Sequence, residues 1–233
     1  MRQFGIIGSP LEHSYSPRFF SEYFRLHNID AFYQAYELDS IDAYPALIKE
    51  NLFAGLNVTA PFKQTIIPYL DDISDTAREI GAVNVIRFAD GRTTGYNTDH
   101  LGFRESIEPY LKERHIRRAV LLGRGGASKA VHYALGMLHI DSRMTGREDI
   151  RDIDLKEYDL IVNCTPLGMY PYKDSCPLID YDSIDRHCIC YDLIYNPAQT
   201  LFLQQCARRG ATCINGEQML RLQALYAWDI WNR

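Results

Sequence analysis

Residues 117–138 constrain the fold more than any other part of the chain, because they change from strand to helix across a cluster of glycines. The apolar run RRAVLLG (117–123) predicts a buried strand, and GRGGASKAVHYALGML (123–138) predicts a glycine-rich turn that leads into a helix. Such a turn admits the pyrophosphate of a dinucleotide, whose charge the helix N-terminus stabilises. The alternative is a tight turn with a purely structural role.

The same alternation continues along the chain and predicts an α/β architecture. Strands are predicted at 4–7, 31–38, 55–59, 142–146, 158–165 and 187–195, with a hairpin over 82–97. Helices are predicted at 16–27, 42–50, 74–81, 102–114, 200–210 and 219–231, with another from 61 that Pro68 interrupts. We expect two α/β domains flanking a cleft, with a main boundary near residue 101 and the last helix packing back on the first domain.

Composition excludes several classes of function. Hydrophobic residues make up 46% and charged residues 24% of 233, an ordinary globular composition, and the net charge of −5 disfavours nucleic acid or an anionic membrane as partner. No apolar stretch reaches the length of a membrane span, and the N-terminus does not resemble a signal peptide. The six cysteines form no CxxC pair and no histidines repeat at i, i+4, so we expect buried thiols in a reducing cytoplasm and no metal site.

Polar residues follow several predicted strands. Ser14 and Ser16 in HSYSP stand at the mouth of a helix, where hydroxyls suit a small carboxylate; alternatively they cap the helix and stabilise a turn. Thr59, Asn84 and Asp99 end other strands, and Asp99 taken alone reads as the N-cap of the following helix. Polar side chains gathered at strand ends are typical of an open α/β site.

Lys63, in GLNVTAPFK (55–63), falls in the first turn of a predicted helix. The positive end of the helix dipole and partial burial would both disfavour its charged form. A nearby carboxylate such as Asp99 would oppose both effects and hold the amine in place. The combination suits proton transfer near neutral pH, whereas the alternative is a surface lysine that points into water.

The end of the strand after the glycine turn bears on the choice of dinucleotide. In SRMTGRED (142–149), Arg147 stands where a cation would meet a 2′-phosphate, which favours NADP. Glu148 is adjacent and leaves NAD as the alternative.

Eight stretches together resemble the shikimate dehydrogenase family over nearly the full length. They are, in the family's order, GSPLEHSYSP, GLNVTAPFK, GAVNV, GYNTDHLG, GRGGASKA, VNCTPLGM, YDLIYNP and NGEQMLRLQA. The resemblance implies an NADP-linked interconversion of shikimate and 3-dehydroshikimate, a step in the biosynthesis of chorismate and the aromatic amino acids. It also implies a substrate-binding and catalytic domain at 1–101 with the final helix 216–233, and a dinucleotide-binding domain at 102–215.

The resemblance further implies roles for individual residues. Lys63 and Asp99 match the catalytic pair, and Ser14 and Ser16 match serines that hold the substrate carboxylate. The groups that bind the ring hydroxyls correspond to Thr59, Asn84, Asp99 and Gln223, and a tyrosine lining the same site corresponds to Tyr195. The cofactor-binding positions correspond to Gly123, Arg124, Gly125, Gly126 and Ala127 for phosphate, Arg147 for the adenosine phosphate, and Leu193 and Gly216 for the nicotinamide.

Three features that bear on the cofactor depart from the family. Arg124 replaces a residue that is usually small, where it would either add a phosphate contact or obstruct one. Gly146-Arg147-Glu148 replaces the usual Asn-Arg-Thr. Only eleven residues separate Arg147 from Asp159, where the family carries a helix, a strand and their loops. A crossover with its helix needs at least about 10–12 residues. We therefore expect a trimmed Rossmann-like domain that lacks a βα unit and binds NADP more weakly.

Two rival functions remain at this point. One is a related dehydrogenase that takes quinate and NAD, which Ser14, Ser16 and Arg147 disfavour. The other is a non-catalytic binding protein built on a shortened family domain, against which Lys63 and Asp99 speak. In each case the partner is a small molecule, and we expect a cytoplasmic monomer or homodimer.

Overall fold

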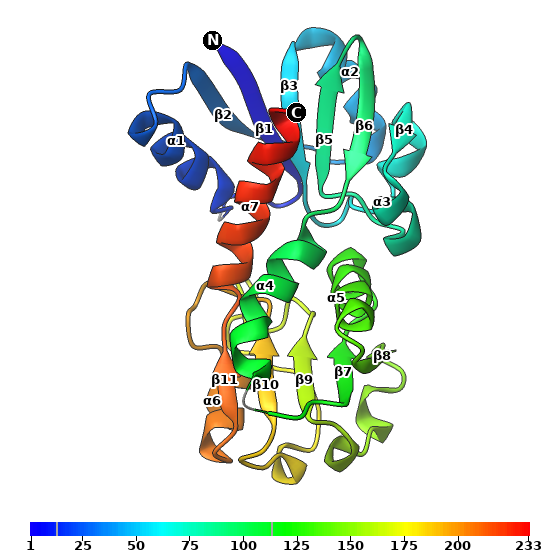
Figure 1. The fold of residues 1–233 in the computed structure, drawn as a ribbon, viewed down its shortest axis with the longest axis vertical. Coiled ribbons are helices and arrows are strands. Elements are labelled where there is room, and N and C mark those ends of the chain that lie inside the picture. Colours follow the sequence, from blue (N-terminus) through cyan, green and yellow to red (C-terminus); the bar gives the residue numbers. More distant parts are fainter. Residues whose placement is uncertain (13, 113) are drawn as a thin grey trace. The chain divides into compact units, whose positions relative to one another are not determined.

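The computed structural model describes residues 1–12, 14–112 and 114–233. The chain forms two compact units (Figure 1). Unit 1 comprises residues 1–98 and 224–233, and unit 2 comprises residues 99–223. The chain therefore passes from one unit to the other twice.

Unit 1 is built on a six-stranded mixed sheet with the order β2-β1-β3-β5-β6-β4. Its strands are β1 (Arg2–Gly8), β2 (Ala31–Glu37), β3 (Phe53–Val58), β4 (Asp72–Ile73), β5 (Val85–Ala89) and β6 (Arg92–Tyr96). Its helices are α1 (Ser16–Leu26), α2 (Tyr44–Glu50), α3 (Asp75–Ile80) and the C-terminal part of α7 (Glu217–Trp231). β1 pairs in parallel with β2 and β3, whereas β5 is antiparallel to both β3 and β6.

Alternation along β1 places apolar residues on both faces of this sheet. Phe4 and Ile6 join a core cluster with α1 and the end of α7, and Ile7 joins another with α2 and α3. The Trp231 ring lies so close to Gly55 that a Cβ there would collide with it, and its Nε1 donates to the Ile86 carbonyl at 3.0 Å. The last turns of the chain are thus part of the unit 1 core.

The helix expected from residue 61 does not form. Residues 60–66 instead form turns, which lead into a 3₁₀ turn at Ile67–Tyr69. The Lys63 carbonyl accepts a hydrogen bond from the Val83 N–H at 2.7 Å, which holds it next to the start of β5. The Ile67 N–H donates to Gln64 instead of completing an α-helical bond to Lys63. Lys63 therefore does not lie in the first turn of an α-helix, and the dipole argument does not apply to it.

Unit 2 is built on a five-stranded parallel sheet with the order β11-β10-β9-β7-β8. The strands are β7 (Arg118–Leu122), β8 (Asp141–Thr145), β9 (Leu160–Asn163), β10 (Ile189–Asp192) and β11 (Thr212–Ile214). The helices are α4 (Asp99–Leu111), α5 (Gly126–Met137), α6 (Leu201–Arg208) and the N-terminal part of α7. The short strands β4 and β11 were not expected from the sequence.

One strand of the usual dinucleotide-binding order is missing. Numbered along the chain from β7, the five strands read 2-1-3-4-5, which corresponds to the complete order 3-2-1-4-5-6 with its third strand left out. Residues 146–159, all of which the structure describes, contain 3₁₀ turns at Ile150–Asp152 and Leu155–Glu157 but neither strand nor α-helix. β8 therefore becomes the edge strand, which confirms the prediction of a trimmed domain without one βα unit.

Apolar residues cover both faces of the unit 2 sheet. One cluster joins β7, β9 and β10 to α4 and α5, and includes Phe103, Leu121 and Tyr191. The other packs α6 and the 3₁₀ turns against the opposite face, and includes Val120, Cys190 and Phe202. Among the described residues, no helix has the length and apolar character needed to cross a membrane.

Candidate active site

A chain of buried hydrogen bonds crosses one end of the unit 1 sheet. The Tyr33 hydroxyl donates to Asn57 Oδ1 at 2.7 Å, and Asn57 Nδ2 donates to the Asn84 carbonyl at 3.2 Å. Asn84 Nδ2 donates to Thr98 Oγ1 at 3.0 Å, while its Oδ1 accepts from the Thr98 N–H at 2.7 Å. Buried polar groups need such partners, so the chain fixes these side chains relative to one another.

Ser16 is attached to this chain of bonds. It is buried and forms the first residue of α1, where Tyr15 and not Ser16 is the N-cap. Burial raises the pKa of Tyr33 well above its usual value, and a hydrogen bond from Ser16 opposes that shift. The Tyr33 hydroxyl therefore stays protonated and links Ser16 to Asn57. Ser14 is half-buried in the preceding turn, where its N–H donates to the Leu11 carbonyl at 2.9 Å.

Lys63 and Thr59 lie beyond the end of β3, and both are half-buried. The hydrogen bond from the Val83 N–H to the Lys63 carbonyl fixes the lysine backbone next to Val83. Asn84 is the residue that follows Val83, so Lys63 and Asn84 are close. The Thr59 N–H donates to the Ile7 carbonyl at 2.9 Å and so continues the β1–β3 pairing. The structure brings Thr59, Lys63 and Asn84 to the same end of the sheet.

Asp99 is buried and begins α4, the first element of unit 2. Its peptide bond joins it to Thr98, which Asn84 holds. Gln223, on α7, is also buried and donates from Nε2 to the Leu220 carbonyl at 2.9 Å. A Cβ on Gly102 of α4 would lie 3.0 Å from the Gln223 N, so α4 and α7 pack closely at this point.

The glycine-rich turn lies between β7 and α5, as the sequence indicated. Gly123 has a φ of +129°, which favours glycine, and its N–H donates to the Thr145 carbonyl of β8 at 2.9 Å. A Cβ on Gly125 would meet nothing within 4 Å, so a ligand can approach the backbone there. The first N–H groups of α5, at Gly126 and Ala127, have no acceptor within the helix. These residues fit the pyrophosphate of a dinucleotide.

Two predicted cofactor residues, Leu193 and Gly216, follow β10 and β11 and lie together at the same carboxyl end of the parallel sheet as the glycine-rich turn. Gly216 donates from its N–H to the Ile194 carbonyl at 3.0 Å, and a Cβ on Gly216 would collide with the Leu193 carbonyl oxygen. Leu193 in turn donates to the Asn163 carbonyl at 3.0 Å. Tyr195 is half-buried in the same segment.

Arg147 is exposed directly after β8. Arg124, whose effect on phosphate was left open by the sequence, forms ion pairs with Glu148 and Asp149. Both carboxylates follow β8, and neither was singled out as part of an ion-pair network at the sequence level.

A second buried network follows β10. Asp192 accepts hydrogen bonds from Thr200 Oγ1 at 2.5 Å, and from the Ile194 N–H and Asn163 Nδ2, each at 3.0 Å. Burial raises the pKa of Asp192 to about 6, although all three hydrogen bonds favour the charged form. This carboxylate ties the segment that contains Leu193 to the end of β9.

Sequence reasoning missed Tyr33, Thr98 and Asp192 as site residues. Tyr33 occupies a buried position in an ordinary strand pattern, where a tyrosine reads as core. Asp192 gave a usable signal, because a carboxylate that ends a buried apolar strand needs partners. Among the residues that the structure describes, no cluster of three His, Cys, Asp or Glu side chains could hold a metal ion.

Named proteins are similar in sequence to this chain over nearly its whole length. The shikimate dehydrogenase (NADP(+)) of Methanosphaera stadtmanae is 38% identical, in an alignment that covers 97% of this chain and 90% of the relative. The chain belongs to the shikimate dehydrogenase family. Residues 6–86 also match the family described as the shikimate dehydrogenase substrate binding domain. This match lies wholly within unit 1 of the family member described here.

Solved structures of the shikimate dehydrogenase family share the fold. The Thermus thermophilus enzyme, in complex with NADP(H) and shikimate, has a TM-score of 0.86 and 28% identity over 99% of this chain and 93% of that one. The Listeria monocytogenes enzyme, in complex with shikimate and NAD, has a TM-score of 0.81 and 25% identity over 100% and 92%.

Proposed function

We propose that the chain is an NADP-dependent shikimate dehydrogenase, an oxidoreductase that reversibly reduces 3-dehydroshikimate to shikimate in the biosynthesis of chorismate and the aromatic amino acids. The observation that carries this proposal is family membership, since the alignment with a named relative covers 97% of this chain. In addition, Lys63 and Asn84 lie at the same end of the unit 1 sheet. In this proposal, unit 1 supplies most of the substrate groups and unit 2 the dinucleotide groups.

The reaction adds hydrogen to both ends of a carbonyl group. When it is bound, the nicotinamide supplies a hydride to the carbon. Lys63 donates a hydrogen bond to the carbonyl oxygen and delivers the proton, and it accepts that proton in the oxidation direction. Asp99 orients the Lys63 ammonium by accepting a hydrogen bond from it.

The remaining predicted residues hold the substrate. The hydroxyls of Ser14 and Ser16 hold the carboxylate, a small anion that short polar side chains can satisfy. Ser16 turns its single hydroxyl proton from Tyr33 to the carboxylate when the substrate binds. Thr59, Asn84 and Gln223 bind the ring hydroxyls, and Tyr195 lines the same site. The Asn84–Thr98 bonds support this assignment because they leave the asparagine little freedom to turn away.

The dinucleotide is assigned to the turn before α5 and to the segments that follow three strands, β8, β10 and β11. The backbone from Gly123 to Ala127 binds the pyrophosphate, with Arg124 beside it. Arg147 meets the adenosine phosphate, and Leu193 and Gly216 contact the nicotinamide. The open space at Gly125 and the close approach of Gly216 to Leu193 support these roles.

A second candidate is a dehydrogenase that takes quinate as well as shikimate, with NAD. The carboxylates of Glu148 and Asp149 after β8 favour it, because an acidic residue there suits the free ribose hydroxyls of NAD. We further propose that the enzyme works in the cytoplasm as a monomer or homodimer. Its six free cysteines suit a reducing compartment.

An absorbance assay at the reduced-nicotinamide band tests the proposal. Shikimate and quinate would each be combined with NADP+ and with NAD+. We expect the highest kcat/KM with shikimate and NADP+. Faster turnover of quinate with NAD+ would favour the second candidate. Measurable shikimate binding without any reduction of either dinucleotide would contradict both and support a non-catalytic family member.

A further inference from the structure

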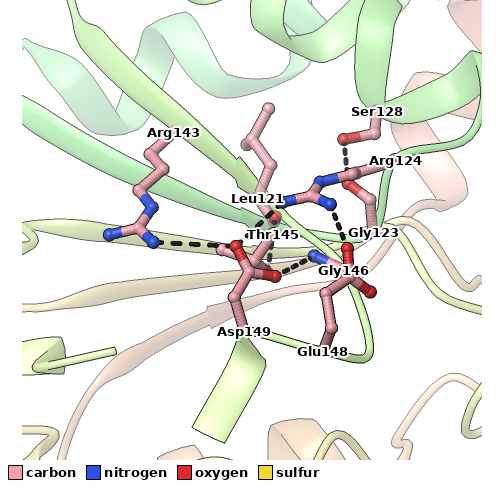
Figure 2. A network of polar contacts seen from close by, with 9 residues as sticks. All are labelled: Leu121, Gly123, Arg124, Ser128, Arg143, Thr145, Gly146, Glu148 and Asp149. Atoms are coloured by element: carbon pink, nitrogen blue, oxygen red, sulfur yellow. Dashed lines mark hydrogen bonds and ion pairs between the residues drawn. The ribbon is translucent and has the colours of Figure 1, made fainter. Parts of the chain in front are cut away.

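Arg124, in the glycine-rich turn, is half-exposed but also contacts other residues of unit 2. Figure 2 shows the Arg124 guanidinium directed toward the residues that follow β8. One of its terminal nitrogens contacts Glu148 Oε1, and the other lies 2.8 Å from Asp149 Oδ2. Arg143, on β8 itself, lies 3.6 Å from the same Asp149 oxygen. Two cations and two carboxylates therefore share one small region of unit 2.

The two carboxylates are held differently. Asp149 Oδ1 accepts a hydrogen bond from the Gly146 N–H at 2.6 Å, and the side chain is 24% exposed. This bond, together with the charges of Arg124 and Arg143, lowers the pKa of Asp149. The Glu148 side chain is 66% exposed. Asp149 is thus anchored to the backbone, whereas Glu148 is the carboxylate that can leave.

Glu148 takes its place only because residue 146 is glycine. A Cβ at Gly146 would lie 2.5 Å from both carboxylate oxygens of Glu148. Because those atoms are the far end of a flexible side chain, a larger residue at 146 would displace the glutamate rather than the backbone. Gly146 and Glu148 therefore act together in setting the charge that faces Arg124.

This region is where a dinucleotide-binding unit distinguishes its two cofactors. At the end of the second strand, an acidic residue suits free ribose hydroxyls and an arginine suits a 2′-phosphate. β8 is that second strand, and it is joined to the glycine-rich turn by the bond from Gly123 to Thr145. The Arg124 side chain reaches this position from the glycine-rich turn and contacts Glu148 there.

We propose that Arg124 is a cofactor-selecting residue of this chain, and that the Glu148 carboxylate competes with the 2′-phosphate of NADP for its guanidinium. While Glu148 holds Arg124, the enzyme discriminates only weakly between NADP and NAD. When the 2′-phosphate displaces Glu148, Arg124 becomes a phosphate ligand, and Asp149 keeps the turn in place. This inference rests on the proposed function, because it takes the ligand of unit 2 to be a nicotinamide dinucleotide.

Equilibrium binding tests the proposal without relying on turnover. Calorimetric titrations of the wild type, E148Q, R124A and the double variant would use NADP+ and NAD+, and also the fragments 2′,5′-ADP and 5′-AMP. E148Q should raise the ratio of NADP+ to NAD+ affinity about three- to tenfold, the scale of a single exposed charge contact. R124A should lower that ratio about tenfold, since a charge-assisted contact to phosphate is lost.

The double variant separates competition from simple repulsion. If Glu148 acts by holding Arg124, then E148Q in the R124A background should change the ratio by less than about twofold. An undiminished effect of E148Q there would overturn the proposal, because Glu148 would then act on the phosphate directly. Equal weakening of NADP+ and NAD+ by R124A would also overturn it, because Arg124 would then serve the shared pyrophosphate.

Two further variants serve as controls. G146A should displace Glu148 and reproduce the E148Q ratio, and an unchanged ratio in G146A would count against the proposal. R118Q breaks a comparably exposed ion pair, from Arg118 to Glu157 at 3.2 Å, at the opposite end of β7 and should leave both affinities unchanged. If the wild type binds neither dinucleotide nor fragment, the proposed function fails as well. If it binds and turns over but the ratio never moves, only this inference fails.

Discussion

Lys63 is the residue on which the proposed chemistry depends most directly. Its backbone is fixed by Val83 beside Asn84, so its half-buried side chain starts from a defined place at the end of the sheet. Replacing Lys63 with Ala should lower kcat by about two to four decades, the typical contribution of general acid–base catalysis. Steady-state kinetics with shikimate and NADP+ would measure the loss.

The matched control for this prediction is Lys49 of α2, an exposed lysine in the same unit. Lys49→Ala should leave kcat unchanged. Wild-type kcat in the Lys63→Ala variant would show that the proton comes from another group.

Tyr33 is a positioning residue rather than a catalytic one. Its hydroxyl joins Ser16 to Asn57, so Tyr33→Phe leaves the buried Asn57 Oδ1 without its donor. We expect the free energy of unfolding to fall by about 1–3 kcal/mol, the cost of one unsatisfied buried group. We also expect KM for shikimate to rise several-fold with a smaller change in kcat, because Ser16 loses its support.

Tyr36 provides the comparison on the same strand. Its hydroxyl accepts from Gln3 Nε2 at 2.7 Å, away from the Ser16–Asn57 connection. Tyr36→Phe should leave KM for shikimate unchanged. A purely structural role for Tyr33 would instead lower stability in Tyr33→Phe without moving KM.

At the scale of elements, Asp192 links the ends of β9 and β10 and makes unit 2 sensitive to pH. Its folded pKa of about 6 lies above the ordinary value of 3.8, so the folded state retains the proton over a wider range. This contribution to stability is complete below about pH 4 and is lost as the pH rises through about 6. The loss amounts to at most about 3 kcal/mol, at about 1.4 kcal/mol per unit of pKa.

Asp192→Asn removes the titration and keeps the shape of the side chain. Chemical unfolding from pH 4 to pH 8 should show the wild type losing stability relative to the variant, with most of the change between pH 4 and pH 7. Parallel profiles for the two proteins would contradict the assignment to Asp192.

The elements were largely predictable from the sequence, and their polar connections were not. Apolar runs and the glycine turn located β7 and α5, and counting residues after Arg147 revealed the missing strand. The pattern failed at Lys63, where helix-forming residues were overridden by a tertiary bond to Val83. Because tertiary partners are not encoded in local periodicity, the Tyr33 and Arg124 networks became visible only in the structure.

At the scale of the whole molecule, the cysteines report on global unfolding. Cys188, Cys190 and Cys206 are buried in the unit 2 core, with Cys206 on α6 itself and the other two in or next to β10. Cys213 is exposed, but partial burial of its thiol raises the pKa to about 11, so little thiolate is present at neutral pH. Thiolate is the reactive form. We expect Cys213 to be alkylated before these three, and slowly, whereas they should react only when the molecule unfolds.

Mass spectrometry of peptides after timed alkylation would measure these rates. Increasing urea should accelerate labelling of Cys188, Cys190 and Cys206 together, at the concentration where the fold is lost. Labelling of Cys190 as rapid as that of Cys213 in native buffer would show that the α6 face opens locally.

The seating of Trp231 against Gly55 has a consequence for how the protein is made. Strands β1 to β6 leave the ribosome first, yet their core needs Ala227, Ile230 and Trp231, which emerge more than a hundred residues later. The earliest segment must therefore wait, with one apolar face uncovered, while unit 2 (residues 99–223) is translated. Domains usually complete themselves in the order of synthesis. Here unit 1 emerges first, but its core is completed last. We therefore expect a nascent chain arrested before α7 to bind chaperones.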